Sequence, residues 1–390
     1  MYPRLSDLIN DLLGTNILLP AKTFGFFLAL AFIAAYIPLK ADLNRREKLG
    51  QYTPKRKRVR TAGPMGIQEV IIHALIWGLA GYKLGLWISD RALFNNHTEE
   101  ALLSAKGFWL TGLLGLILGG GWKYLEYKKH KDEKEKFEEI DTYPSFYLGT
   151  VVTIAFVAGI LGSKLFAMLE PHSGFWKDPL GDLMSFNGLS FFGGLLCAGG
   201  LIIYYLHRKG FHILTAVDAF APGLALANAV GRIGCQLSGD GDWGIANTSP
   251  KPGWLSWAPD WMWAFDYPHN VAQEGIAMPG CDPAIFDVYC RHLAVPVFPT
   301  PFYETLMGTA IFIILWSIRK KMKYAGLVTG IYMILIGLER FLIEKIRVNE
   351  AYDIAGLHFT QAELISTILV LGGAAILFFS IRTKRELRQA

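Results

Sequence analysis

Charged residues are scarce in this chain, and cysteine pairs at metal-binding spacing are lacking. Of its 390 residues, 18% are charged and 52% are hydrophobic, whereas a soluble globular chain carries about 25% charged residues. The four cysteines include no Cys-x-x-Cys pair, which argues against a zinc or redox motif. Apolar residues gather in continuous runs, unlike the alternating segments of an outer-membrane barrel. The composition favours an all-α polytopic membrane protein and excludes disordered and disulfide-scaffold classes.

Nine apolar runs have roughly the length that a helix needs to cross a bilayer, about 20 residues. The sixth run is the least apolar, because it contains Asp218, Asn228 and Arg232. We predict transmembrane helices at residues 21–39, 67–88, 105–125, 146–169, 189–206, 213–238, 302–318, 325–344 and 361–381.

The basic residues predict how these spans are oriented. Most of the 38 Lys and Arg residues fall in every second loop, starting with residues 40–60 and 123–136, and basic loops stay on the cytoplasmic side. We therefore expect the N-terminus outside, the C-terminus inside and a long periplasmic loop at residues 239–300. The net charge of +5 then reflects topology, and we expect no nucleic-acid partner.

Two charged segments lie on the predicted inner side. The run PKRKRVR (54–60) is interpreted as a topology determinant, the alternative being a site for anionic headgroups. Residues 123–141 mix both charge signs at helical spacing. This pattern predicts a solvated extension of the third helix.

The outer loop 239–300 is rich in Trp, Pro, Gly and Asp. Loops of this length are usually functional, and clustered Trp residues suit the headgroup layer of a membrane. Cys281 and Cys290 lie nine positions apart in this loop. We expect them to form a disulfide, the alternative being two free thiols.

Charged residues inside the spans are the main functional signal, because each costs about 2.5–3.5 kcal/mol on insertion scales. Arg340, Glu344 and Arg347 follow i, i+4 and i+7 spacing, so they share one face of a helix. One interpretation is a buried structural ion-pair ladder. The other is an anion site in which Glu344 orients the guanidinium groups, since the planar Arg fork suits phosphate.

Glycine-rich motifs lie at the same predicted membrane boundary. GRIGCQLSGDGDWG (231–244) places Arg232 beside a Gly-rich turn, and FNGLSFFGG (186–194) opens the fifth span. Tyr303 and Glu304 open the seventh span from the same side. These elements predict recognition of, or chemistry on, a phospholipid headgroup at the outer leaflet.

These motifs resemble those of the prolipoprotein diacylglyceryl transferase family. GRIGCQLSGDGDWG resembles its Gly-Arg-x-Gly-Asn signature with the following Gly-acid turn, and FNGLSFFGG resembles its Gly-x-Ser-Phe-His-Gly-Gly element. FPTPFYE (298–304) resembles its His-Pro-x-x-x-Tyr-Glu element, and GLERFLIEKIR (337–347) its Arg-x-x-x-Glu-x-x-Arg helix. GSKLF (162–166) resembles its Gly-Ala-Arg-Leu-Phe turn.

The resemblance implies a transferase of the bacterial inner membrane that uses no metal and no cofactor. Its substrates would be phosphatidylglycerol and preprolipoproteins, whose lipobox cysteine thiol, after the signal peptide, accepts diacylglycerol as a thioether while glycerol 1-phosphate leaves. The implied catalytic residues are Arg232, Arg340, Glu344 and Asp240. The implied lipid-binding residues are Arg232, Lys164, Arg347, Tyr303, Glu304, Gly193, Gly194 and Gly244.

The chain departs from the family pattern at four polar positions. Phe192 replaces the motif His, Cys235 the signature Asn, Phe298 the His before Pro299, and Phe24 a Tyr. Without the His, the thiol proton would pass to an acid such as Glu344 or Asp240, or the cationic field would lower the thiol pKa. The alternative functions are a divergent paralogue that binds phospholipid or precursors without transfer, and an unrelated transporter.

Five segments follow from the resemblance and the spans. They are residues 1–39 with the first span, 40–145 as an inserted basic loop with two extra spans, 146–238 as core spans with the Gly-rich motifs, 239–300 as the periplasmic head loop, and 301–390 with the last three spans.

Overall fold

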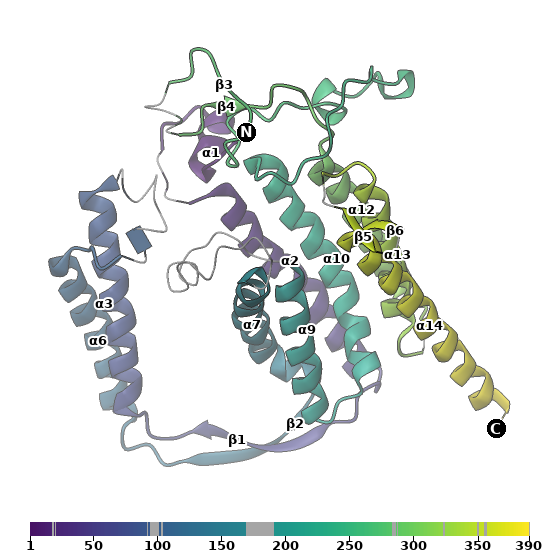
Figure 1. Ribbon diagram of the computed structural model, residues 1–390. Coiled ribbons are helices and arrows are strands. Elements are labelled where there is room, and N and C mark those ends of the chain that lie inside the picture. Colours follow the sequence, from purple (N-terminus) through teal and green to yellow (C-terminus); the bar gives the residue numbers. More distant parts are fainter. Residues whose placement is uncertain are drawn as a thin grey trace. The chain divides into compact units, whose positions relative to one another are not determined.

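The computed structural model describes residues 1–17, 19, 21–91, 93, 101–102, 104–168, 191–282, 286, 288–322, 324–348, 351–354 and 357–389. Within these residues each predicted span overlaps a helix (Figure 1). The helices are α2 (Thr23–Lys48), α3 (Ile67–Ser89), α6 (Trp109–His130), α7 (Leu148–Met168), α9 (Phe191–Arg208), α10 (Ile213–Ser238), α12 (Thr300–Ile318), α13 (Leu327–Glu344) and α14 (Gln361–Gln389).

Six of the described helices are long and apolar enough to cross a membrane. They are α2, α3, α7 with its preceding turn, α10, α12 and the apolar part of α14. The chain is therefore an α-helical membrane protein. The count of nine spans and their orientation remain predictions.

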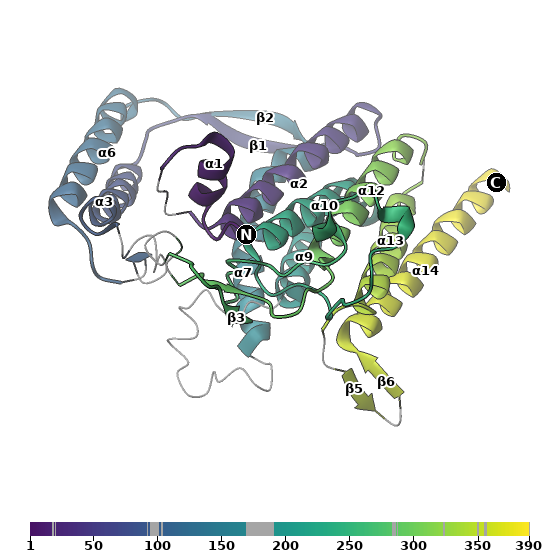
Figure 2. The same cartoon turned by 90° about the horizontal axis from the view of Figure 1, so that it is seen from above.

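The chain divides into two compact units. The first comprises Met1–Gln51 and Lys209–Ala390, and the second comprises Tyr52–Arg208. In the first unit α10 packs against α2, α12 and α13, while α13 packs against α14 (Figures 1 and 2).

Small residues on α10 let its neighbours approach closely. A Cβ atom on Gly223 would lie 2.7 Å from the backbone oxygen of Ala35 on α2, and one on Gly308 of α12 would lie 3.2 Å from Cβ of Ala229. The buried core between α10, α12 and α13 comprises Ala221, Ala225, Ile311, Leu315 and Val328. This packing joins the first half of α10 to α12 and α13, and the contact of Gly308 with Ala229 continues it along α12 toward Arg232.

The N-terminal end of α13 is tied to α10 by a buried carboxylate. Asp218 accepts hydrogen bonds from the backbone N–H groups of Gly326 (2.9 Å) and Thr329 (2.8 Å). Close by, Asp42 of α2 pairs with Arg46 (2.7 Å) and Arg319 (3.1 Å). Charged residues therefore join α2, α10, α12 and α13 at the end of α10 far from Arg232.

The second unit contains two helix pairs, α3 with α6 and α7 with α9, and a two-stranded ribbon. The ribbon pairs β1 (Lys55–Ala62) with β2 (Lys136–Thr142) in antiparallel fashion. The predicted helical extension over residues 123–141 holds as far as His130, where α6 ends, and is wrong for the later residues, because β2 follows. Basic residues of β1 face acidic residues of β2, as in Arg58 opposite Glu139. This charge pairing between segments 80 residues apart favours a strand.

The loop at residues 239–300 of the first unit is a packed head. Its core contains Trp243, Tyr267, Leu293 and Val297, and the Tyr267 hydroxyl donates to Gln236 on α10 (2.8 Å). A disulfide joins Cys281 to Cys290, whose Cα atoms lie 5.7 Å apart.

The remaining short elements of the chain are α1 (Leu5–Leu13), β3 (Ile276–Ala277), β4 (Arg291–His292), β5 (Ala351–Ile354), β6 (Leu357–Thr360), and the 3₁₀ turns η1 (Pro144–Tyr147), η2 (Gly253–Leu255) and η3 (Asp260–Met262).

Candidate active site

The candidate site lies at the C-terminal end of α10, where a glycine-rich turn reverses the chain. Gly239 ends the helix in the left-handed conformation (φ 64°), and its N–H donates to the carbonyl of Cys235 (3.0 Å). Glycine adopts this conformation without the steric cost that other residues incur. Gly241 continues the turn with φ 100°. Asp242 is thereby brought back beside Arg232, which precedes the helix end by less than two turns.

Arg232 lies between two carboxylates that come from different segments. Its Nη1 contacts Asp242 of the turn. Its Nε lies 3.1 Å from Oε2 of Glu304, which belongs to the first turns of α12 and is 1% exposed. A guanidinium group held by two carboxylates is fixed in both position and orientation.

Glu304 also contacts Arg340 of α13 and Arg347, which follows that helix. Arg340 Nη1 donates to Oε1 of Glu304 at 3.2 Å, and Arg347 Nη1 lies 3.6 Å from the same oxygen. Arg347 donates further to Asp242 (2.8 Å), and Arg340 pairs with Glu344 (3.7 Å). Three arginines thus converge on one buried carboxylate. We call Arg232, Arg340 and Arg347 the arginine cluster.

Within the part of the chain that the structure describes, the arginine cluster has buried hydrogen-bond donors without a partner. They are Nε of Arg340 and both Nε and Nη1 of Arg347. A buried donor left unpaired costs about 1–3 kcal/mol, and an anion that accepted these bonds would remove that cost. Guanidinium groups bind phosphate oxygens through paired N–H donors. The arrangement is therefore suited to hold a phosphate group.

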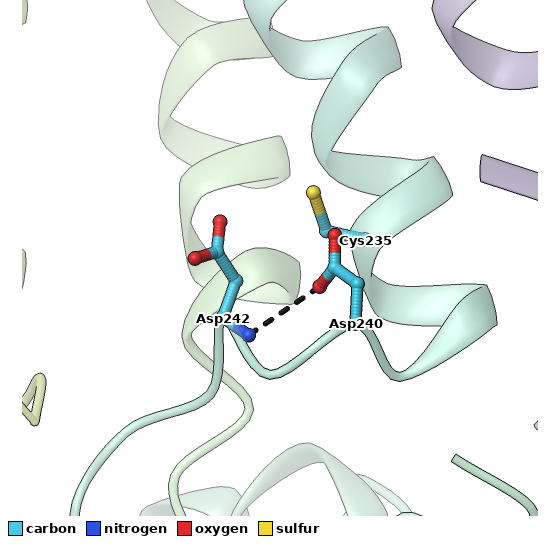
Figure 3. Close-up of side chains that lie close together, drawn as sticks. All are labelled: Cys235, Asp240 and Asp242. Carbon is cyan, nitrogen blue, oxygen red and sulfur yellow. Dashed lines mark hydrogen bonds between the residues drawn. The ribbon is translucent and has the colours of Figure 1, made fainter. Parts of the chain in front are cut away.

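The two acids of the turn differ in their electrostatics (Figure 3). The backbone N–H of Asp242 donates to Oδ1 of Asp240 (3.3 Å). Burial and then the charge of Asp242 raise the pKa of Asp240 above its ordinary value. Burial would also raise the pKa of Asp242, but Arg232 and Arg347 outweigh it and lower that pKa. Asp242 is therefore the more acidic group of the two, and it is the one that pairs with the arginines.

Cys235, Asp240 and Asp242 bring potential metal ligands within 4.8 Å of one another (Figure 3). Thiolate and carboxylate groups are ligands that zinc accepts. However, Arg232 contacts Asp242 and its Nη1 lies 3.9 Å from Sγ of Cys235. The guanidinium cation of Arg232 thus already neutralises the negative charge of these side chains. We therefore infer that the turn positions Arg232 and does not bind a metal ion.

Gly244 and Tyr303 hold the segments of the site together. A Cβ atom on Gly244 would lie 2.4 Å from the backbone oxygen of Ile346, so only glycine lets the chain pass there. Gly244 forms a β-bridge with Arg347, which brings that arginine beside the turn. The Tyr303 hydroxyl donates to the carbonyl of Met262 (2.8 Å) and anchors the loop 239–300 to α12.

The other predicted lipid-binding residues belong to the second unit. Lys164 is buried on α7, and Gly193 and Gly194 lie near the start of α9. A Cβ atom on Gly193 would lie 2.4 Å from the backbone oxygen of Gly162, and one on Gly194 would lie 2.4 Å from Oγ of Ser163. Both glycines therefore allow α7 and α9 to pack closely. Residues 186–190 of the motif lie outside the described residues.

Two features of the site differ from the sequence prediction. We named Asp240 as the acid of the turn, whereas the ion pairs go to Asp242. We also expected Glu344 to orient the guanidinium groups, whereas Glu304 contacts all three. Arg347 reaches the site from beyond α13, which ends at Glu344. The sequence signal for Glu304 was an acid at the start of an apolar span, and the spacing of GDGDWG could not separate its two acids.

Comparison with known proteins places this chain in a family. A model of the family described as prolipoprotein diacylglyceryl transferase matches residues 103–379, starting inside the segment 40–145 that we expected to be inserted. The phosphatidylglycerol–prolipoprotein diacylglyceryl transferase of Chlorobaculum tepidum is 27% identical over 267 residues, which cover 65% of this chain and 79% of the relative. The enzyme of that name from Thermus thermophilus is 32% identical over 232 residues, 57% of this chain and 78% of the relative. Because the family match covers more than half of its length, this chain belongs to the prolipoprotein diacylglyceryl transferase family and is a transferase of lipoprotein biosynthesis.

Proposed function

We propose that this protein transfers the diacylglyceryl group of phosphatidylglycerol to the lipobox cysteine thiol of preprolipoproteins. The C–O bond between diacylglycerol and phosphate breaks, a C–S thioether bond forms, and glycerol 1-phosphate leaves. The observation that carries the proposal is the arginine cluster around Glu304, with its unpaired buried donors. Preorganised cations of this kind stabilise the negative charge that grows on the leaving phosphate.

Each acid of the site has a proposed positioning role. Glu304 and Asp242 hold the arginines in place, and Glu344 supports Arg340. Asp240 accepts the N–H of Asp242 and so fixes the turn. The family resemblance adds Gly244 and Tyr303 to the proposed lipid site. It also implies lipid-binding roles for Lys164, Gly193 and Gly194 of the second unit.

The test is thioether formation on a lipobox peptide, using purified protein and phosphatidylglycerol vesicles. Arg232→Ala and Arg340→Ala should each lower transfer by about 100-fold or more while the protein still inserts. Arg56→Ala, which removes an exposed arginine from β1, should leave transfer unchanged. Turnover near the wild-type rate in both cluster variants would contradict the phosphate-binding role. A wild-type protein that binds phosphatidylglycerol without transfer would instead indicate the binding-only alternative.

We further infer nine spans in the bacterial inner membrane, with the N-terminus and the head loop on the outer side. Trp254 and Trp257 support this placement of the loop, because they are 74% and 77% exposed and lie one 3₁₀ turn apart. An impermeant maleimide should label Trp257→Cys in intact spheroplasts and Lys57→Cys only after lysis, with the unsubstituted protein as background. The reverse labelling pattern would contradict the orientation.

A further inference from the structure

One buried carboxylate beside the arginine cluster has no role in the site described so far. Glu339 directly precedes Arg340 on α13 and is 5% exposed. Within the described part of the chain it makes no ion pair, and its Oε1 has no hydrogen-bond partner. An unpaired acid inside a membrane helix is costly, which makes it a candidate for function. The family motif that GLERFLIEKIR resembles starts at Arg340, so motif comparison passes over Glu339.

Glu339 lies on the face of α13 that packs against α10 and α12. Tyr332, Leu335 and Ile336, one and two turns earlier, pack against the core shared with those helices. Its charge interacts with Glu304 on α12, Arg232 on α10, Arg340 on α13 and Arg347 beyond it, and with Tyr332. Glu339 is therefore a neighbour of the atoms that would hold the phosphate.

The other acids of the site are engaged by partners. Glu304 contacts all three arginines, and Asp242 contacts two of them. Glu344 pairs with Arg340, and Asp240 accepts the N–H of Asp242. A carboxylate that already neutralises cations is a weak proton acceptor, because protonation would leave those cations unpaired. Glu339 differs from these acids, because within the described residues it makes no ion pair and its Oε1 accepts no hydrogen bond.

We propose that Glu339 is the general base that removes the proton from the substrate thiol. The step rests on the proposed diacylglyceryl transfer. The thiol S–H bond breaks and an O–H bond forms on Glu339, while the thiolate attacks the glyceryl carbon of the lipid. The C–O bond breaks with its electron pair on the phosphate oxygen, which the arginine cluster stabilises. Glu339 then returns the proton to the leaving phosphate monoester or to water.

The test compares two acceptor peptides, one with the lipobox cysteine and one with selenocysteine in its place. A selenol ionises at lower pH than a thiol, whose pKa is about 8.5, so it needs no base at neutral pH. With the cysteine peptide, Glu339→Gln should lower transfer by about 100-fold or more. With the selenocysteine peptide the same variant should recover to within about tenfold of the wild type. Transfer to cysteine by this variant should also rise with pH as the thiol ionises.

The controls separate this role from structural effects. Glu126→Gln removes a carboxylate from α6 and should not change either rate. Arg340→Ala should lose transfer with both peptides, because the phosphate still needs its cations. Should Glu339→Gln fail to insert, Glu339→Asp carries the same comparison with a smaller loss. If Glu339→Gln lost the same fraction of transfer with both peptides, the role of Glu339 as a base would be wrong and the proposed function would stand. If the wild-type protein transferred to neither peptide, the proposed function itself would be wrong.

Discussion

Nε of Arg232 lies 3.1 Å from Oε2 of Glu304, and this ion pair joins α10 to α12 through a carboxylate side chain that is only 2% exposed. Glu304 compensates Arg340 and Arg347 as well. Removing one partner of a buried ion pair leaves an uncompensated charge, which costs about 3–5 kcal/mol. Glu304→Gln should therefore lower the thermal unfolding midpoint in detergent and abolish most transfer.

An exposed ion pair is the matched comparison for Glu304. Asp260 pairs with Lys251 at 2.6 Å, but its side chain is 92% exposed. Exposed pairs contribute about 0–1 kcal/mol, so Asp260→Asn should change neither the unfolding midpoint nor transfer appreciably. If both substitutions had the same small effect, the buried ion-pair account of the site would be wrong.

Gly244 tests whether the close approach of two backbone segments sets the position of Arg347. The new Cβ of Gly244→Ala would meet the backbone oxygen of Ile346 at 2.4 Å and force the segments apart. We expect a loss of about 1–3 kcal/mol in unfolding free energy and a larger relative loss of transfer, because Arg347 would leave Asp242. Gly253→Ala in the same loop is the control, since nothing lies within 4 Å of its Cβ position. Transfer should be assayed at saturating lipid, and equal rates for both variants would count against this account.

The sequence predicted the helices well, because hydropathy and length are local properties. It failed where the partner is distant in the chain. Residues 136–142 include acids that pair with the basic strand β1, which lies some 80 residues earlier in the chain. The spacing of charges within residues 123–141 could not indicate that pairing, because it describes local sequence only. The same limit applies to GDGDWG. Only the path of the turn after Gly239 decides that Asp242, and not Asp240, faces Arg232.

The two acids of that turn should respond to pH in opposite ways. The pKa of Asp240 is raised in the folded state, so its charged form destabilises the fold at neutral pH, and the penalty disappears as pH falls from the raised pKa toward 3.8. Asp240→Asn should thus stabilise the protein at pH 7, and less as pH falls. The pKa of Asp242 is lowered, so its contribution is full above 3.8 and is lost only below that value. Asp242→Asn should therefore destabilise throughout the range from pH 7 to pH 4. Thermal unfolding across this range gives the comparison, and parallel curves for the two variants would refute it.

The disulfide between Cys281 and Cys290 should stabilise the head loop. Closing a loop of this size restricts the unfolded chain, with typical effects of about 2–4 kcal/mol. Replacing both cysteines by serine should lower the unfolding midpoint of the head, followed by tryptophan fluorescence. Reductant should lower the wild-type midpoint to the same value and leave the double variant unchanged, because the free thiols of Cys197 and Cys235 form no bond that it could break. A wild-type midpoint indifferent to reductant would show that the bond does not support the head.

Asp218 links the far end of α13 to the site, since that helix carries Arg340 about 21 Å further along its axis. Its carboxylate accepts two backbone N–H groups at the start of α13 and the hydroxyl of Thr329 (2.7 Å). It also lies 4.0 Å from Arg46, so Asp218→Ala removes both a helix cap and the partner of a buried cation. We expect a loss of about 2–4 kcal/mol in unfolding free energy and reduced transfer. Asp218→Asn keeps one acceptor oxygen and should lose less of both, as measured by thermal unfolding and peptide lipidation on the same preparations. If Asp218→Ala kept full transfer, the position of Arg340 along α13 would not depend on Asp218. The packing of α13 against α14 would then have to be enough to fix the position of Arg340.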